Sequence, residues 1–173
     1  MTSKSITRMT NCLVIELVNT LREAPMTFVP KFLTVSKALT RAKKKEAGKE
    51  LEDISKEVEN YKNLKILEMS EGLTYVADEL VRKLINIGEE NIKVERKDID
   101  ELCSQFLNSY ENLYYILDYG DIDNIVTRVL ITEKDPKRLN KSAIFSNEYN
   151  YIGAASRLFI EEDLSLILLA TKV

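Results

Sequence analysis

Near its C-terminus the chain reads YNYIGAASRLFIEEDLSLILLA over residues 149–170. Two parts of this stretch, Tyr149–Phe159 and Leu164–Ala170, are apolar and partly β-branched, as strands commonly are. The polar IEED between them is typical of a turn. We therefore predict an antiparallel hairpin. Because both runs are almost continuously apolar, we expect the hairpin to lie in the middle of the fold, with helices on both faces.

The sequence before the hairpin is dominated by apolar residues at helical spacing. Met9–Glu23 carries one such stripe, and Thr10 or Asn11 is a candidate for its N-cap. A second stripe runs over Glu71–Ile85, where Ser70 is the candidate N-cap. Several helices followed by a terminal antiparallel pair are typical of an α+β sandwich.

One short strand is predicted upstream of the hairpin, in the apolar and aromatic run Leu113–Leu117. Tyrosines surround this run, and two interpretations of them are open. They could form a recognition surface, since aromatic residues are enriched at interfaces. Their alternation with leucine and isoleucine favours core packing instead, with the hydroxyl groups reaching the rim. The residues concerned are Tyr110, Tyr114, Tyr115 and Tyr119.

No linker divides the chain, and 173 residues are the size of one ordinary domain. We predict a single domain over residues 9–173, preceded by a polar N-terminal tail, residues 1–8. The tail carries Lys4 and Arg8 without an acidic residue, whereas the whole chain has a net charge of -3. We therefore predict that Lys4 and Arg8 lie on an acidic surface of a partner protein, with Ile6 as a small apolar contact.

Charge and hydropathy exclude several classes of partner. Lys and Arg number 25 against 28 Asp and Glu, so there is no basic excess and we predict no nucleic-acid binding. The basic run RAKKKEAGKE, residues 41–50, contains two glutamates and no aromatic residue, which favours a solvated segment. No apolar run is long enough for a membrane span. We expect a cytoplasmic protein, secreted only if a leader has been removed.

The chain contains no histidine. It therefore lacks the commonest general base, the commonest metal ligand and the usual partner of a serine or cysteine nucleophile. Cys12 and Cys103 fit neither a metal motif nor a disulfide framework, and both lie among apolar residues, which predicts buried free thiols. We expect no catalytic residue, no metal site and no cofactor.

Four segments follow one another in the order of a known family. They are NTLREAP (residues 19–25), MSEGL (69–73), SYENLYYI (109–116) and TEKDPKRLNKSAIFSNEYNYIG (132–153). With them the chain resembles a divergent, protist-type member of the CAP superfamily, the cysteine-rich secretory, antigen 5 and pathogenesis-related 1 proteins. The positions that match the family's motifs are Asn19, Arg22, Pro25, Met69, Ser70, Glu71, Leu73, Glu111, Asn112, Leu113, Ile144, Phe145, Tyr149, Ile152 and Gly153.

The resemblance implies an α+β fold of the CAP type, a three-layer α-β-α sandwich with the C-terminal antiparallel hairpin in its central sheet. It also implies a cleft in which the family carries two histidines and two acidic residues for a divalent metal. Glu111 falls on one of these acids and Asn140 on one of the histidines, and both are remnants of the family cleft. Asparagine cannot replace imidazole as a transition-metal ligand or a base near neutral pH, so the site is degenerate. For Glu111 we favour a structural role, capping a turn or pairing with Lys141 or Arg138, over that of a surviving site acid.

Together these features predict a non-enzymatic structural or adaptor protein whose degenerate CAP-like domain binds other proteins of a multi-subunit assembly. Abundant Lys, Asn and Ile suggest an AT-rich genome such as a protist's, where a cytoskeletal or ciliary assembly is one setting. Two alternatives stay open. One is a secreted CAP-type protein that binds a lipid or sterol in a groove. The other is a hydrolase that uses Glu111 with a second carboxylate.

Overall fold

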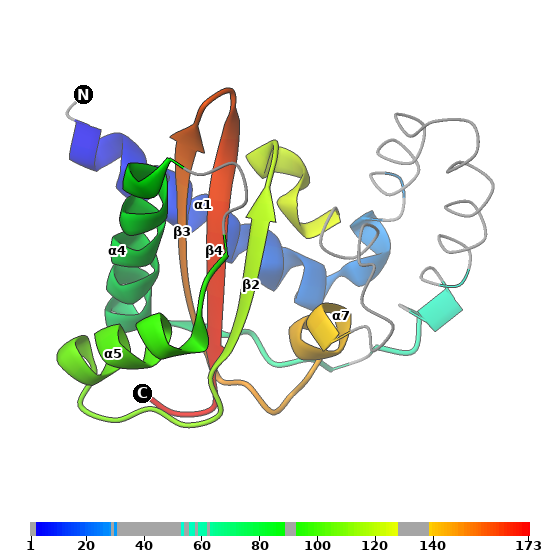
Figure 1. Ribbon diagram of the computed structural model, residues 1–173. Coiled ribbons are helices and arrows are strands. Elements are labelled where there is room, and N and C mark those ends of the chain that lie inside the picture. The colour runs from blue at the N-terminus through cyan, green and yellow to red at the C-terminus, as the bar shows by residue number, and fades with distance from the viewer. Residues whose placement is uncertain are drawn as a thin grey trace.

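The computed structural model contains a four-stranded sheet with helices on both sides (Figure 1). It describes residues 3–28, 30, 53, 56–57, 59–61, 63–88, 93–127 and 139–173, without the side chains of residues 3–8, 124 and 139. The helical elements are α1 (Ser3–Glu23), η1 (Pro25–Phe28), α4 (Glu71–Ile87), α5 (Arg96–Phe106), η2 (Ile122–Asn124) and α7 (Leu139–Ile144). The strands are β1 (Glu68–Met69), β2 (Tyr114–Tyr119), β3 (Tyr151–Phe159) and β4 (Glu162–Ala170).

The predicted hairpin forms the centre of the sheet, whose strand order is β1-β3-β4-β2. β3 and β4 pair antiparallel with Ser156 opposite Ser165, and β2 pairs antiparallel with the other side of β4. β1 pairs with β3 in parallel. The turn is shorter than the sequence suggests, because only Ile160 and Glu161 lie between the strands and Glu162 already belongs to β4.

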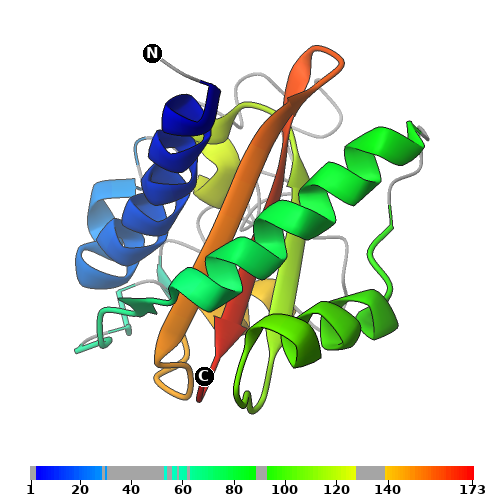
Figure 2. The same cartoon turned by 90° about the vertical axis from the view of Figure 1, so that its left-hand side faces the viewer.

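Helices cover both faces of the sheet, as the pattern of the hairpin predicts. Along β4, Leu166 and Leu168 pack in one cluster with α4 and α5, while Ile167 and Leu169 pack in another with α1 and α7. This alternation follows from the strand, in which successive side chains point to opposite faces. Figure 2 shows the result, with α1 on one side of the sheet and α4 and α5 on the other. The fold is an α+β sandwich of three layers.

The first helix begins earlier than predicted. The sequence places its start at Met9, but α1 begins at Ser3, so the backbone of residues 3–8 is helical. The predicted cap is therefore wrong, since Thr10 and Asn11 lie inside the helix. Asn11 is 95% buried and accepts a hydrogen bond from the main-chain N–H of Ser156 (3.0 Å), which ties α1 to β3. The side chains of Lys4, Ile6 and Arg8 lie outside the described part, and their role stays a prediction.

The start of α4 packs directly on β3. Ser70 caps the helix as predicted, because its Oγ accepts from the N–H of Leu73 (3.2 Å). Beside this cap, a Cβ atom added to Gly153 would lie 2.4 Å from backbone and side-chain atoms of Leu73 and from the nitrogen of Thr74. A side chain at residue 153 would therefore hold the helix away from the strand.

The hairpin turn has an unusual backbone. Ile160 has a φ of 61° and its side chain is 71% exposed. A β-branched residue is disfavoured in the left-handed region, where its Cβ crowds the backbone. The turn therefore holds an exposed apolar side chain at a position that suits glycine.

Candidate functional site

Glu111, the acid that the resemblance places in the family cleft, lies on the surface just before β2. Its carboxylate is 3.2 Å from the ammonium group of Lys172, and the two side chains are 60% and 58% exposed. Their backbones form an isolated antiparallel bridge. Lys172 is a partner that the sequence did not predict, and the structural role of Glu111 stays a prediction. Lys141 pairs elsewhere, and Arg138 lies outside the described residues.

Asn140, which stands where the family has a histidine, lies in the first turn of α7. Its Oδ1 accepts a hydrogen bond from the hydroxyl of Tyr114 (2.6 Å). The Tyr114 ring lies 6.4 Å from the ring of Tyr149, with the planes tilted by 47°. The amide therefore connects α7 to β2, as we would expect of a hydrogen-bonding structural residue rather than a base.

Lys141, the next residue along, forms a buried ion pair with Glu57. The lysine side chain is 3% exposed and the glutamate side chain 37% exposed. Burying an ammonium group is costly unless a carboxylate accompanies it, so Glu57 is the partner that allows Lys141 to lie inside the fold. The charge of Lys141 is thus satisfied by Glu57 and not by Glu111.

The Asn-x-x-Arg motif of α1 binds two other segments of the chain. Asn19 exchanges two hydrogen bonds with the main chain of Leu67, donating to its carbonyl (3.0 Å) and accepting from its N–H (2.9 Å). Arg22 is 2% exposed and donates to the carbonyls of Lys65 (2.9 Å), Ser146 (2.8 Å) and Ile144. These bonds join α1 to the segment before β1 and to the end of α7.

Burial also alters the acid–base properties of this motif. Burial lowers the pKa of the Arg22 guanidinium to about 10, so the group stays charged near neutral pH. Its three carbonyl acceptors satisfy part of that charge, since carbonyl oxygens accept strongly from ionised donors. Nη2 of Arg22 has no hydrogen-bond partner among the described atoms. The arrangement stabilises a fold and offers no group for proton transfer.

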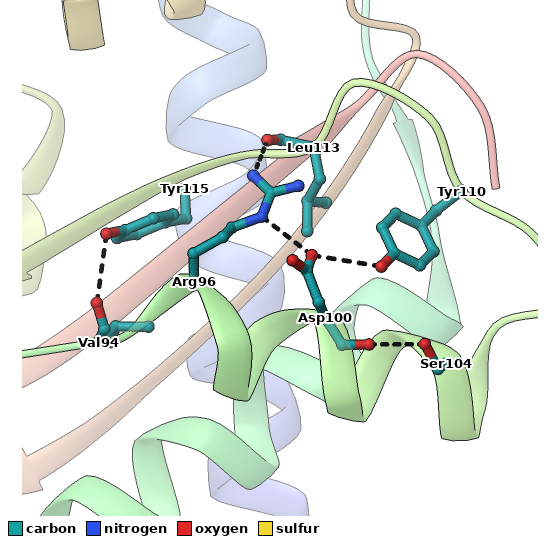
Figure 3. Close-up of polar contacts among 7 residues, drawn as sticks. All are labelled: Val94, Arg96, Asp100, Ser104, Tyr110, Leu113 and Tyr115. Carbon is teal, nitrogen blue, oxygen red and sulfur yellow. Dashed lines mark hydrogen bonds and ion pairs between the residues drawn. The ribbon is translucent and has the colours of Figure 1, made fainter.

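Three of the four tyrosines near β2 are half-buried, as the core-packing interpretation predicts, whereas Tyr119 is 44% exposed. Tyr115 donates to the carbonyl of Val94 (3.2 Å), and Tyr110 donates to the carboxylate of Asp100 (3.2 Å), as Figure 3 shows. The same carboxylate accepts from Nε of Arg96 (2.9 Å), while Nη1 of Arg96 donates to the carbonyl of Leu113 (2.6 Å) (Figure 3). This network fixes α5 against β2.

Of the two thiols, Cys103 is buried as predicted, whereas Cys12 is only partly buried. Burial and the neighbouring carboxylate of Asp100 raise the pKa of Cys103 from 9.0 to about 11. A buried thiol that stays protonated is a poor nucleophile. Among the described residues, no group of three or more His, Cys, Asp and Glu side chains could hold a metal ion.

Sequence reasoning missed one polar contact that joins two layers. Arg157 in β3 binds Asp78 in α4 through two parallel hydrogen bonds, Nε to Oδ1 at 2.9 Å and Nη2 to Oδ2 at 2.8 Å. Arg157 is the only charge within the apolar run Tyr149–Phe159, and Asp78 lies beside the buried Ala77. A charge inside an apolar run is the signal that could have identified the pair.

A groove of about 500 Å³ opens near these residues, between the N-terminal part of α1 and the C-terminal part of α4. Its floor is β3. The residues that line it are Thr10, Arg82, Ile85, Asn86, Ser156, Arg157, Leu158 and Asp163. The sequence analysis assigned no function to this part of the chain. Neither Glu111 nor Asn140 lines the groove, so it is separate from the remnants of the family cleft.

Comparison with protein-family profiles gives no match, and comparison with curated protein sequences gives none either. Solved structures do show the fold. A cysteine-rich secretory protein from Staphylococcus aureus superimposes with a TM-score of 0.58 at 10% identity, over 96% of this chain. This chain spans only 39% of the length of that protein. An outer surface protein from Borrelia burgdorferi gives a TM-score of 0.50 at 20% identity, over 72% of this chain and 94% of that one.

These similarities show that the fold is CAP-like. The predicted α+β class and the resemblance to CAP proteins are confirmed at the level of the fold. None of the helices that the structure describes combines the length and the apolar character needed to span a bilayer.

Proposed function

We propose that this chain is a non-enzymatic CAP-like domain that works by binding another protein. One observation supports the proposal most directly. The two residues that the resemblance places in the family cleft take part in structural contacts, Glu111 with Lys172 and Asn140 with Tyr114. With no histidine in the chain, no imidazole base or imidazole metal ligand can complete such a site. Binding is the activity that a CAP-like fold without this chemistry can still perform.

Purification from the source cells tests protein binding. A tagged chain should co-purify with a defined protein in fixed proportion, and the substitutions Glu111→Gln and Asn140→Ala should leave the amount of that protein unchanged. A chain that elutes alone under mild conditions would contradict the proposal. We propose a cytoplasmic assembly as the setting, with cytoskeletal and ciliary structures the first to be tested by cell fractionation.

Calorimetry with Zn²⁺ tests the absence of a metal function. We expect no tight, saturable site, because Glu111 and Asn140 offer only one carboxylate and one amide. One tight site in the wild-type chain that disappears in Glu111→Gln would contradict this. So would a hydrolytic activity lost in the same variant, which would support the hydrolase instead.

The names of the neighbouring structures favour a second candidate, a secreted or surface-exposed protein. One neighbour is described as secretory and the other as an outer surface protein. In that setting the chain would bind a lipid or sterol, the alternative that the family resemblance raises. Recovery of the protein from the culture medium, with a bound lipid in its extract, would favour this candidate over the cytoplasmic one.

A further inference from the structure

The outer edge of β3 is only partly covered by another strand. β1 pairs with it at Tyr151 and Ile152 alone. Beyond Ile152, no strand among the described residues pairs with this edge, although β3 continues to Phe159. Strand edges normally carry main-chain groups that can pair with a further strand.

The register shows which main-chain groups point outward. In an antiparallel pair, alternate residues direct their N–H and C=O groups toward or away from the partner. Ile152 accepts from the N–H of Ser70 (2.9 Å) and Ser156 donates to Asn11 (3.0 Å), so both are directed away from β4. Leu158 is two residues after Ser156 in β3, so its main-chain groups have the same direction as those of Ser156. Asp163 lies opposite Leu158 in β4, and its carbonyl accepts from the N–H of Gly120 (2.9 Å), just after β2. The main-chain groups of Asp163 therefore face β2 and not β3, so those of Leu158 are not bonded to β4. The N–H and C=O of Leu158 therefore point outward.

The groove of about 500 Å³ lies along this outward edge. It is lined by three consecutive residues of β3, Ser156, Arg157 and Leu158. Their side chains alternate between the faces of the sheet, and Asp163 of β4, opposite Leu158, also lines the groove, so the space reaches around the edge of β3 beside the hairpin turn. In Figure 2 the edge of β3 faces the viewer, and toward the hairpin turn it lies between α1 and α4.

The basic side chains of the groove are already paired with carboxylates, so the groove is poorly suited to an anionic ligand. Arg157 is neutralised by the two hydrogen bonds to Asp78, and Arg82 pairs with Glu79 on the same helix, while Asp163 adds a carboxylate that would repel an anion. By contrast, the side chain of Leu158 is 68% exposed beside outward main-chain groups. This combination suits an occupant that pairs through its own main chain and contributes an apolar side chain, and it disfavours a phosphate or another small anion.

We propose that this edge binds an extended peptide segment of a partner protein, which pairs with β3 on the same side as β1 but nearer the hairpin turn. The inference rests on the proposed function, protein binding, and names the surface that performs it. β1 already pairs with the same edge of β3, so the main chain of β3 has the geometry needed to pair with a further strand. The Asn11 amide accepts from Ser156 as the carbonyl of a neighbouring strand would. The added strand pairs with Leu158 and places an apolar residue on its side chain.

The test compares two substitutions of one residue. Leu158→Pro removes the outward N–H without removing a bond to β4, and edge strands tolerate proline. Leu158→Ala keeps the N–H and shortens the side chain. Peptides are selected on the full chain from a random dodecapeptide phage library, and their affinities are measured by fluorescence polarisation. We expect Leu158→Pro to weaken binding by about tenfold or more and Leu158→Ala by no more than about threefold, because the main-chain bonds carry the affinity.

A second measurement keeps the protein unchanged. The selected peptide is N-methylated at alternate positions in each of the two registers, and one register should abolish binding to the wild-type chain while the other leaves it intact. The proposal is overturned if both methylated peptides bind like the parent, if Leu158→Pro binds as tightly as wild type, or if the library yields no binder. A native partner that is retained in full by folded Leu158→Pro would refute this surface but leave the proposed function standing.

Discussion

Arg22 is a buried cation that is held by main-chain carbonyls instead of by a carboxylate. Its acceptors come from the segment before β1 and from the region of α7, so one side chain fixes two connections at once. An apolar side chain of similar size cannot replace Arg22, because it would leave buried carbonyl groups without hydrogen-bond donors. Arg22 therefore has a structural role in this chain that requires no catalytic site.

We expect Arg22→Met to lower the free energy of unfolding by about 3 kcal/mol, since hydrogen bonds to charged groups contribute about 1.5–3 kcal/mol each and the loss is only partly compensated. Arg82→Met is the matched control. Its side chain is 53% exposed and, among the described residues, pairs with Glu79 along the helix, so the loss should stay below about 1 kcal/mol. Urea unfolding of both variants measures the difference, and equal effects would show that the carbonyl bonds of Arg22 are not needed.

At Gly153 we expect an added methyl group to destabilise the fold, because there is no space for it between β3 and α4. Gly153→Ala should destabilise the fold by about 1–3 kcal/mol or more, because the methyl group would lie 2.4 Å from the backbone of α4. Gly88→Asn serves as the control. Nothing lies within 4 Å of that position, and asparagine tolerates its φ of 69°. Thermal melting of the two variants is sufficient, and a stable Gly153→Ala would mean that α4 can move away from β3.

Because the pKa of Cys103 is raised, we expect the free energy of unfolding to depend on pH in the alkaline range. That pKa is about 11 in the folded chain against 9.0 for an exposed thiol, so above pH 9 the unfolded chain loses a proton that the folded chain keeps. The stability from this group is therefore complete below pH 9 and is lost as the pH rises toward 11, with a slope of up to about 1.4 kcal/mol per pH unit. Urea unfolding at pH 8 and pH 10.5 should show a smaller decline in Cys103→Ala than in wild type. An equal decline in both would rule out the thiol as its source.

Among the elements, the β3–β4 hairpin combines the strongest apolar pattern with the least favourable turn. Two-residue hairpin turns prefer glycine or asparagine where φ is positive, and Ile160 stands at such a position with a φ of 61°. The cost of a left-handed backbone at a residue of this kind is about 1–2 kcal/mol. Register is fixed here by the buried strands and not by the turn chemistry.

Ile160→Gly should therefore raise the free energy of unfolding by about 1 kcal/mol, although most substitutions by glycine destabilise a fold. Glu161→Gly provides the comparison, because Glu161 does not have a positive φ and should gain nothing. The test is to measure the denaturant midpoints of the two variants and to compare them with that of the wild-type chain. A destabilised Ile160→Gly would show that the exposed isoleucine makes a contact that offsets its backbone.

The hairpin, the helix after Ser70 and the strand near Leu113 could all be predicted, because each has a periodic apolar pattern or a capping residue. Other features carry no such signal. β1 is only two residues long, and both of its side chains are exposed. Residues 3–8 are polar and show no stripe, so the true start of α1 was not visible. The partner of Glu111 depends on where the chain after β4 passes Glu111, which only the assembled sheet determines.

For the whole molecule, the contacts of α1 with the sheet are known from Asn11 onward, whereas the partner-binding role predicted for Lys4, Ile6 and Arg8 awaits a test. Deletion of residues 1–7 should leave the melting temperature almost unchanged and weaken incorporation into the native complex, because the core of α1 is kept. Asn11→Ala is the contrasting variant and should lower the melting temperature by leaving a buried N–H without its acceptor. Unchanged incorporation of the deletion would remove residues 1–7 from the interface.

The order of the strands has a consequence for synthesis. Both helical layers are translated before β3 and β4, yet each layer buries its apolar face on these two strands. At about 5–20 residues per second, the ribosome takes on the order of ten to thirty seconds to reach Ala170. Until β3 and β4 are made, α1, α4 and α5 lack the two central strands that they cover, so the nascent chain should require chaperone protection until its last strand emerges.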